Sequence, residues 1–385
     1  MKINDNYCVR DAEYVLECYP RFGDVTMRAW SSADECLVEA VPSTPKSQKI
    51  LIVNDVFGAL TIPFHDQQTT VLVDSYLSET AIRRNMRLNG IPEDRVAFAS
   101  SVAELEGKFD VLLMGVNPSR AMLEYELHHV RNALSPKCKI YAATMAKNVD
   151  SSLYTIFQRT LGPTIVMPTS PKTRLFEIEL DLETRTANFD IRYSCYKSVV
   201  ADVEIEVASG PGVFSADHLD TGARLLLEQL PRQMDAEAPI AVGDLGCGAG
   251  ALGLVALSLN PNATAIMVDE SRMALVSAKE TFSRNGVDLS RARFRLANGW
   301  DGTKADSLDL VLCNMPGDID ASHSPRLALQ FLRQTLKVLK PGGRFLFAAR
   351  EDLPIMKQVR ELFPAPVVLV RDEGNIVVLA TKPAR

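Results

Sequence analysis

Cysteine is scarce in this chain, and the few cysteines are scattered. The 385 residues include 7 cysteines, and no two of them form a C-x-x-C pair. Such spacing argues against a zinc site and against a disulfide framework, and it fits a reducing compartment. We therefore expect a cytoplasmic protein whose site holds no metal.

Long apolar runs are also missing, as is any excess of positive charge. No stretch approaches the length that crosses a bilayer, and no signal peptide is expected at the N-terminus. The net charge is −6 and the pI about 5.6, so contact with a nucleic acid must rely on local basic patches. The length suffices for two domains of a soluble globular protein.

The chain does contain a strand, a glycine-rich turn and a helix in direct succession. An apolar approach over 239–242 leads to Asp244, and a helical run over 251–259 follows the turn. The glycines of the turn alternate, at Gly246, Gly248 and Gly250. Glycine permits a tight turn and a close approach to a ligand, and the helix start offers free N–H groups. The pattern predicts a nucleotide-type site at the edge of a parallel sheet.

The acid before the first glycine indicates the kind of ligand. The spacing G-x-G-x-G differs from the dinucleotide fingerprint G-x-G-x-x-G, and a pyrophosphate disfavours a neighbouring carboxylate such as Asp244. A ligand that carries a cation suits the turn better. The stretch resembles motif I of the class I S-adenosylmethionine (SAM) methyltransferases. An ordinary strand-turn-helix is the plain alternative, and a Rossmann oxidoreductase is the weakest one.

The order of strands and helices repeats in the second half of the chain at a nearly constant offset. The corresponding stretches are Asp74 and Asp269, Asn89-Gly90 and Asn285-Gly286, Asn117 and Asn314, and Leu134-Ser135-Pro136 and Leu339-Lys340-Pro341. The tail reads as a hairpin over 366–380. We infer two copies of one α/β fold, over 1–195 and 196–385.

The two copies differ in the turn after the first strand. The first copy has Asn54 to Ala59 where the second has alternating glycines, and these side chains would crowd a ligand. We expect the domain 1–195 to have lost the cofactor and to pack against the other copy and hold a substrate. The domain 196–385 is then the cofactor-binding one. A fused pseudo-dimer needs no second subunit, so we expect a monomer.

Two polar residues follow strands of the second copy. Asp269 lies where a carboxylate can take both ribose hydroxyls, and the alternative role is a helix cap. Asn298 can meet an adenine amino group, and the alternative role is a turn residue. Between the copies, Ser215 or Asp217 is expected to cap a helix with an apolar leucine face.

The residues Leu312-Cys313-Asn314-Met315-Pro316-Gly317 resemble motif IV of methyltransferases that modify exocyclic amines. An aryl amine is a poor nucleophile because its lone pair is delocalised into the ring. The Asn314 oxygen and a following backbone carbonyl can accept its two N–H groups and align the nitrogen with the methyl group. Asn314 and Pro316 are therefore the candidate catalytic residues.

Over nearly its whole length the chain resembles the bacterial ribosomal RNA guanine-N2 methyltransferases of the RsmC/RlmG type, and the large-subunit enzymes more than the small-subunit ones. The resemblance lies in 54–60, 74–76, 87–90, 213–215, 219–224, 244–250 and 268–271. It implies two tandem class I (Rossmann-like) methyltransferase domains, of which the N-terminal one is degenerate and the C-terminal one binds SAM. It also implies methylation of a guanine N2 in large-subunit ribosomal RNA, either naked or in an early assembly particle. The implied cofactor site comprises Phe214, Asp244, Gly246, Cys247, Gly248, Gly250, Asp269, Glu270 and Asn298.

The chain departs from the family at one motif. The family pattern Asn-Pro-Pro-Phe is here Asn314-Met315-Pro316-Gly317, with Asp318 next. The change removes a stiff backbone and an aromatic ring whose stacking on a base is worth about 1–3 kcal/mol. Two alternatives arise, a methyltransferase for another acceptor and a degenerate relative that binds RNA without methylating it. His323 is a conceivable substitute for the ring, but nothing in the sequence places it.

Clustered arginines are the candidates for RNA contact. They are Arg83, Arg84 and Arg87 on the helix expected over 76–88, and Arg291, Arg293 and Arg295 on one face of a strand. Such a cluster can bind phosphates, and the alternative is an ordinary solvated face.

Overall fold

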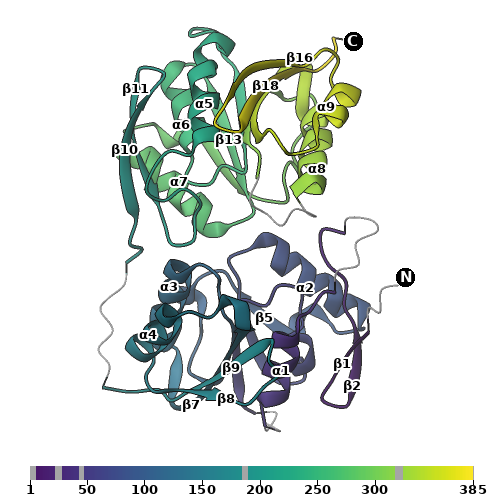
Figure 1. Ribbon diagram of the computed structural model, residues 1–385, viewed down its shortest axis with the longest axis vertical. Coiled ribbons are helices and arrows are strands. Elements are labelled where there is room, and N and C mark those ends of the chain that lie inside the picture. Colours follow the sequence, from purple (N-terminus) through teal and green to yellow (C-terminus); the bar gives the residue numbers. More distant parts are fainter. Residues whose placement is uncertain (1–5, 22–27, 43–46, 184–189, 317–323, 385) are drawn as a thin grey trace. The chain divides into compact units, whose positions relative to one another are not determined.

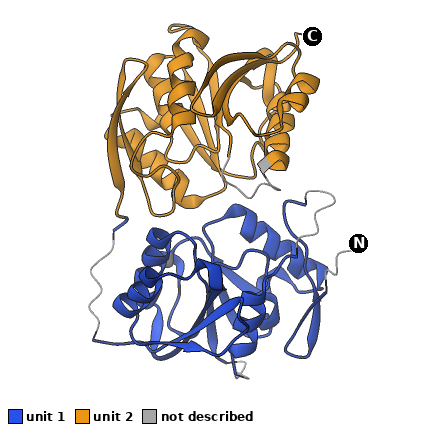
Figure 2. Ribbon diagram, viewed as in Figure 1, with its two compact units in different colours: residues 1–191 blue, residues 192–385 orange. Residues whose placement is uncertain are grey.

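The computed structural model of the protein describes residues 6–21, 28–42, 47–183, 190–316 and 324–384. The chain divides into two compact units, Met1–Ile191 and Arg192–Arg385 (Figure 2). The division predicted from the sequence lies at residue 195. Both units are α/β, as the sequence predicts.

The second unit contains the glycine-rich turn. Its strands are β10 (Ser194–Val200), β11 (Val203–Ser209), β12 (Ala241–Leu245), β13 (Thr264–Asp269), β14 (Ala292–Leu296), β15 (Leu308–Asn314), β16 (Leu339–Arg350), β17 (Val367–Asp372) and β18 (Asn375–Thr381). Its helices are α5 (Thr221–Gln229), α6 (Ala251–Leu259), α7 (Arg272–Arg284), α8 (Ser324–Val338) and α9 (Met356–Leu362) (Figure 1).

The first unit repeats this alternation. Its strands are β1 (Asn6–Val9), β2 (Ala12–Val15), β3 (Lys49–Val53), β4 (Gln68–Leu72), β5 (Val96–Ala99), β6 (Phe109–Gly115), β7 (Leu134–Met145), β8 (Thr164–Met167) and β9 (Thr173–Ile178). Its helices are α1 (Ser32–Ala40), α2 (Tyr76–Leu88), α3 (Arg120–Arg131) and α4 (Ser151–Thr160), with a short 3-10 turn η1 (Ile62–Phe64) after β3.

Each unit builds a seven-stranded sheet of the same topology. The orders are β5-β4-β3-β6-β7-β9-β8 and β14-β13-β12-β15-β16-β18-β17. The first five strands of each order are parallel, and the last two pair antiparallel. One fold therefore occurs twice, and the C-terminal hairpin is β17–β18, as predicted. The direction of the connections reverses between β12 and β15, which is where parallel sheets bind ligands.

The helix caps correct one equivalence expected from the sequence. Ser75 caps α2 and Ser271 caps α7, and both side chains accept a backbone amide of the first turn. Aligned on these caps, Asp269 corresponds to Val73 and not to Asp74. The equivalence expected from the sequence rested on residue type, whereas in the structure the capping residues of the two helices show which positions are equivalent.

The strand ends correct a second equivalence. In each unit, the amide one residue past the end of the strand donates to a carbonyl of the next strand. Val116, after β6, bonds β7, and Met315, after β15, bonds β16. Asn314 therefore corresponds to Gly115 and not to Asn117. The loop asparagine of the first unit lies beyond the strand end, so it does not repeat the role expected of Asn314.

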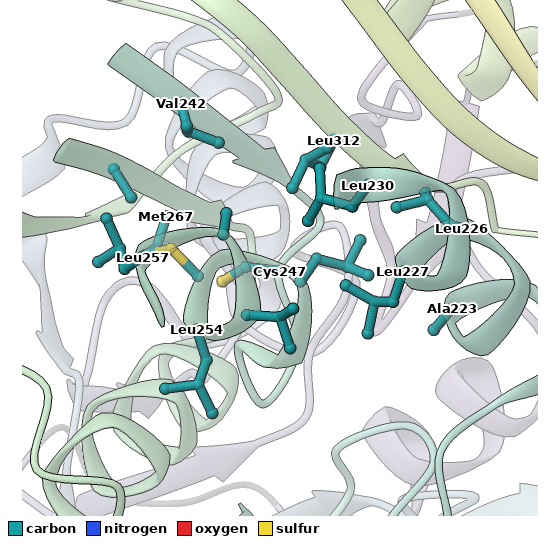
Figure 3. Packing of buried hydrophobic residues seen from close by; sticks show 14 of the residues in the cluster. Ala223, Leu226, Leu227, Leu230, Val242, Cys247, Leu254, Leu257, Met267 and Leu312 are labelled. Carbon is teal, nitrogen blue, oxygen red and sulfur yellow. The ribbon is translucent and has the colours of Figure 1, made fainter. Parts of the chain in front are cut away.

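One of the two cores of the second unit lies between the sheet and helices α5 and α6. Leucines of both helices pack against apolar side chains of the central strands (Figure 3). Those labelled there include Leu226 and Leu227 of α5, Leu254 and Leu257 of α6, and Val242, Met267 and Leu312 of the strands. Cys247 belongs to the same cluster, so the glycine-rich turn is anchored in the core by its one larger side chain.

Candidate functional site

The glycine turn between β12 and α6 is open on one side. Gly246, Gly248 and Gly250 have φ values of 67°, 51° and 85°, in the left-handed region that favours glycine. A Cβ at Gly250 would lie 2.9 Å from the Cβ of Ala278, so this glycine is needed for close packing against α7. A Cβ at Gly246 or Gly248 would meet nothing within 4 Å. The open side therefore leaves room for a ligand close to the backbone.

Asp244 lies directly behind this turn and is fully buried. Its Oδ2 accepts the Gly253 amide at 2.8 Å, and its Oδ1 has no hydrogen-bond partner among the described residues. Burial, with a smaller contribution from the charge of Asp269, raises the pKa of Asp244 to about 7. A ligand with a positive charge would favour the ionised form of this carboxyl.

Asp269, at the end of β13, contacts the same turn. Its Oδ2 accepts the Gly248 amide at 2.9 Å, and its Oδ1 accepts the Ser271 amide at 3.0 Å. Ser271 is the cap of α7, so the helix-cap role considered for Asp269 belongs to Ser271. The half-buried Glu270 lies between the two. Two carboxylates, Asp244 and Asp269, thus flank the glycine turn.

The remaining cofactor candidates differ widely in exposure. The Cys247 thiol is buried, which raises its pKa well above the usual range, and its amide bonds the Val268 carbonyl. Asn298 is also buried, and its Oδ1 accepts from Gln330 of α8 at 2.7 Å, a contact that favours a structural role. Phe214, in the loop before α5, is 63% exposed, so its ring has a face available for stacking.

Asn314, the last residue of β15, lies beside the glycine turn. β12 and β15 are neighbouring parallel strands whose register pairs Asp244 with Leu312. Continued by two residues, this register puts Asn314 level with Gly246. Asn314 is half-buried, and its Nδ2 donates to Oδ2 of Asp220 at 2.8 Å. A candidate acceptor for an amine therefore adjoins the candidate cofactor turn.

Asp220 is a site residue that the sequence analysis missed. It caps α5, and its side chain accepts the Ala223 amide at 3.2 Å. The prediction that Ser215 or Asp217 is the cap was wrong, because the helix begins only at Thr221. The signal was available, since an Asp immediately before a helical apolar run is a strong N-cap.

Met315 fits its position for two reasons. Its side chain is 4% exposed and packs in the core, with its sulfur 3.8 Å from that of Cys313. Its amide donates to the Ala348 carbonyl at 2.9 Å, a bond that the family's proline cannot make. The bond from Met315 to β16 thus restrains the backbone at the position where the family has a proline ring. The next residue, Pro316, is half-buried. Gly317, Asp318 and His323 lie outside the described residues.

The corresponding turn of the first unit is closed by its own carboxylate. Asp55, after β3, is buried and accepts the amides of Gly58, Leu60 and Thr61 at 2.8, 3.1 and 2.7 Å. Its burial raises its pKa to about 6. Three amides of this turn are therefore satisfied by a carboxylate within it, and the 3-10 helix η1 stands in place of the α-helix α6.

The first unit also lacks the polar groups of the second site. The positions of Asp269 and Asn314 are taken by Val73 and Gly115, neither of which carries a side-chain acceptor. A Cβ at Gly115 would lie 2.7 Å from the carbonyl oxygen of Asn54, so the backbone of the turn fills the space beside it. The first unit therefore has no side-chain acceptor for a ribose or an amine at the two positions that Asp269 and Asn314 occupy in the second unit.

Among the six arginines considered for RNA contact, Arg83, Arg84, Arg87 and Arg291 have partners within the protein. Arg83 and Arg87 both pair with Glu93, at 3.2 and 2.6 Å, and Arg84 lies over a tyrosine ring, 5.0 Å from its centroid. In the second unit, Arg291 donates to three backbone carbonyls at and beyond the end of α6. Arg291 is therefore structural, and a phosphate at Arg83 or Arg87 competes with Glu93.

Among the described residues, none of the helices has the length and apolar character that crossing a membrane requires. Within that same part of the chain, no three His, Cys, Asp or Glu side chains gather in a group suited to a metal ion.

Comparison with known proteins accounts for almost the whole chain. Residues 4–182 match the RLMG N-terminal domain, and residues 204–379 match the methyltransferase small domain. The ribosomal RNA large subunit methyltransferase G of Yersinia enterocolitica is 32% identical over 370 residues, which cover 95% of this chain and 91% of that protein. The protein of the same name from Yersinia pestis is 31% identical over 368 residues, with the same coverage.

The chain belongs to the ribosomal RNA large subunit methyltransferase G family. A solved structure has the same fold as this chain. The T. thermophilus 16S rRNA N2 methyltransferase RsmC, in complex with AdoMet and guanosine, has a TM-score of 0.79 at 19% identity and covers 98% of this chain and 97% of its own. The family resemblance and the tandem methyltransferase fold expected from the sequence are thereby confirmed.

Proposed function

We propose that the protein transfers a methyl group from SAM to the exocyclic N2 of a guanine in large-subunit ribosomal RNA. The observation that carries the proposal is the adjacency of the open glycine turn and Asn314 on the neighbouring strands β12 and β15. Membership of the large-subunit methyltransferase G family supports the choice of RNA. The complex of the related fold with AdoMet and guanosine supports the choice of donor and base.

The residues of the second unit fit SAM. The turn can receive its methionine part on the open side of Gly246 and Gly248, where a Cβ would meet nothing. The buried oxygen of Asp244, which has no hydrogen-bond partner in the described part of the chain, suits the positive charge, and Asp269 is the proposed partner of the ribose hydroxyls. The proposed cofactor site also includes Cys247 and Gly250 of the turn and Glu270 after β13. Its proposed boundary near the adenine is formed by Phe214 and Asn298.

Asn314 and Pro316 are the proposed catalytic residues. The amide oxygen of Asn314 and the carbonyl of Pro316 accept the two N–H groups of the guanine amine, which directs its lone pair toward the methyl carbon. When bound, SAM supplies a methyl group activated by its sulfonium, so that the N–C bond forms as the S–C bond breaks, S-adenosylhomocysteine leaves and a proton passes to water. Alignment is thus the main contribution of the protein.

The first unit has a supporting role in this proposal. Its turn is closed by Asp55 and its sheet lacks both acceptors, so it serves RNA binding and packing and no cofactor. Arg83, Arg84 and Arg87 are the proposed phosphate contacts, with Glu93 as their competitor. We propose that the protein acts in the cytoplasm as a monomer on naked RNA or an early assembly particle.

The first test is methyl transfer from labelled SAM to ribosomal RNA stripped of protein, taken from a strain that lacks the gene. The product nucleoside is mapped by mass spectrometry, and wild type is compared with Asn314→Ala. The exposed Asn262→Ala, in a turn before β13, is the matched control. We expect N2-methylguanosine at one position, a fall in kcat on the order of 100-fold in Asn314→Ala, and no change in the control.

Other outcomes of this test contradict the proposal. Labelling of a different acceptor would point to another methyltransferase activity. SAM binding without transfer to naked RNA or to isolated subunits would point to a degenerate relative that binds RNA, as the altered motif from Met315 onward allows.

A further inference from the structure

One carboxylate oxygen links the start of helix α5 to the end of strand β15. Oδ2 of Asp220 accepts the amide of Ala223 at 3.2 Å and Nδ2 of Asn314 at 2.8 Å. The capping bond fixes the position of the Asp220 side chain at the helix start. The second bond therefore ties the Asn314 amide to a rigid element.

A glycine in the first turn of α5 leaves the space for this contact. A Cβ at Gly222 would lie 2.6 Å from Oδ1 of Asn314 and 3.1 Å from Oδ2 of Asp220. Glycine weakens a helix, and the backbone of Gly222 has no positive φ that would require it. Its presence is explained by the room that the Asn314 amide needs.

We propose that Asp220 is a positioning residue for methyl transfer, which orients the amide of Asn314 so that its oxygen is presented to the target amine. A carboxylate only accepts hydrogen bonds, so the NH₂ end of the amide must face Asp220. The other end, Oδ1, receives no hydrogen bond from the described residues. If the Asn314 amide were reversed, its NH₂ group would face the NH₂ group of the target guanine and could not accept a hydrogen bond from it. This inference rests on the proposed function.

The test keeps the helix cap and removes the contact with Asn314. Asp220→Ser retains a side-chain oxygen that caps α5, but the shorter side chain does not reach Asn314. Asp220→Asn retains both bonds, because the Ala223 amide holds the oxygen of the introduced amide at the place where Oδ2 accepts from Asn314. Asp150→Ser, at the cap of α4, is the matched control.

We expect Asp220→Ser to lower kcat for ribosomal RNA by about 10- to 100-fold, because small misplacements at a reacting centre cost that much. The Kd for SAM and the Tm stay at their wild-type values, and the control changes nothing. Asp220→Asn keeps most of the wild-type kcat, because its oxygen still accepts from Asn314. A merely structural role of Asp220 predicts instead the same kcat in Asp220→Ser and Asp220→Asn, since both side chains cap α5.

A readout without turnover separates this inference from the proposed function. The NMR signal of the Asn314 side-chain amide, identified by its loss in Asn314→Asp, should shift in Asp220→Ser in the ligand-free protein. An unshifted signal, a wild-type kcat in Asp220→Ser, or equal losses in Asp220→Ser and Asp220→Asn would overturn the positioning role. An inactive wild type with the expected shift would instead overturn the proposed function and leave the contact established.

Discussion

The residue behind the glycine turn, Asp244, is one that selection for stability alone would not favour. Asp244 is completely buried, and one of its oxygens lacks a partner among the described residues. A buried carboxyl in this state costs stability when ionised, and it titrates close to neutral pH instead. Such a group is best explained by a cationic ligand that it meets when the site is filled.

Replacing Asp244 by Asn separates ligand binding from stability. Because the folded state raises the pKa of this group from 3.8 to about 7, the native protein keeps a proton that the unfolded chain has lost. Its contribution to stability therefore falls as the pH rises through this window, by about 4 kcal/mol at most. We expect Asp244→Asn to raise the Tm of the ligand-free protein at pH 8, to raise it little at pH 4, and to weaken SAM binding.

Thermal unfolding across pH 4 to 8 and calorimetric titration with SAM check this expectation. The exposed Asp372→Asn serves as the control for a simple change of net charge. A variant that binds SAM as tightly as wild type, or that loses stability equally at every pH, would contradict the role given to Asp244.

At the scale of elements, the two units differ in the connection that leaves the first central strand of each sheet. In the second unit an open glycine turn leads into α6, whereas in the first unit Asp55 bonds three amides of its own turn and only η1 comes after it. The sheet order is the same in both. The two units therefore differ in this connection and in the residues at the positions of Asp269 and Asn314, whereas the order of their strands is retained.

Two glycines of this turn should respond differently to alanine. Both have positive φ, which costs an L-residue about 1–2 kcal/mol. In Gly250→Ala the new Cβ also crowds Ala278, so stability should fall by a further ~1–3 kcal/mol. In Gly248→Ala the Cβ enters open space, so stability falls less while SAM binding weakens at least ~10-fold, about 1.4 kcal/mol.

Denaturant unfolding gives the stability of the two glycine variants, and SAM titration gives their affinity. If Gly248→Ala binds SAM with wild-type affinity, the open side of the turn is not the side that receives the cofactor.

At the scale of the whole molecule, each unit has cores of its own. Two clusters of buried apolar residues lie in each unit, and no cluster of the described residues draws members from both. The groups proposed for the cofactor and the amine all belong to the second unit. Cofactor binding and RNA binding are therefore expected to be separable.

A fragment of residues 192–385 should fold and bind SAM with the affinity of the full chain, because its cores and its site are complete within it. Its KM for ribosomal RNA should rise, because the first unit is proposed to hold the substrate. Circular dichroism, SAM titration and methyl transfer to RNA check these points on one preparation. A wild-type KM in the fragment would exclude an RNA-binding role for the first unit.

Much of the site could be predicted from the sequence because it depends on local rules. The glycines before α6, the acids at the ends of β12 and β13, and the duplication can all be read from spacing and strand ends. Asp220 was missed, although its capping position is visible locally, because its contact with Asn314 joins residues far apart in the chain. Arg291 was considered for RNA, but its carbonyl partners appear only when α6 and the loop beyond it are packed.

By itself, then, the sequence determined the fold class, the duplicated α/β organisation and the glycine turn before α6, since apolar periodicity and glycine spacing act over a few residues. Tertiary structure alone decided which positions of the two copies are equivalent, because hydrogen-bond register and not residue type aligns Asn314 with Gly115. It also decided that Met315 pairs with β16 and that Asp55 closes the other turn. Both depend on which donors and acceptors remain unpaired once the strands and helices have packed.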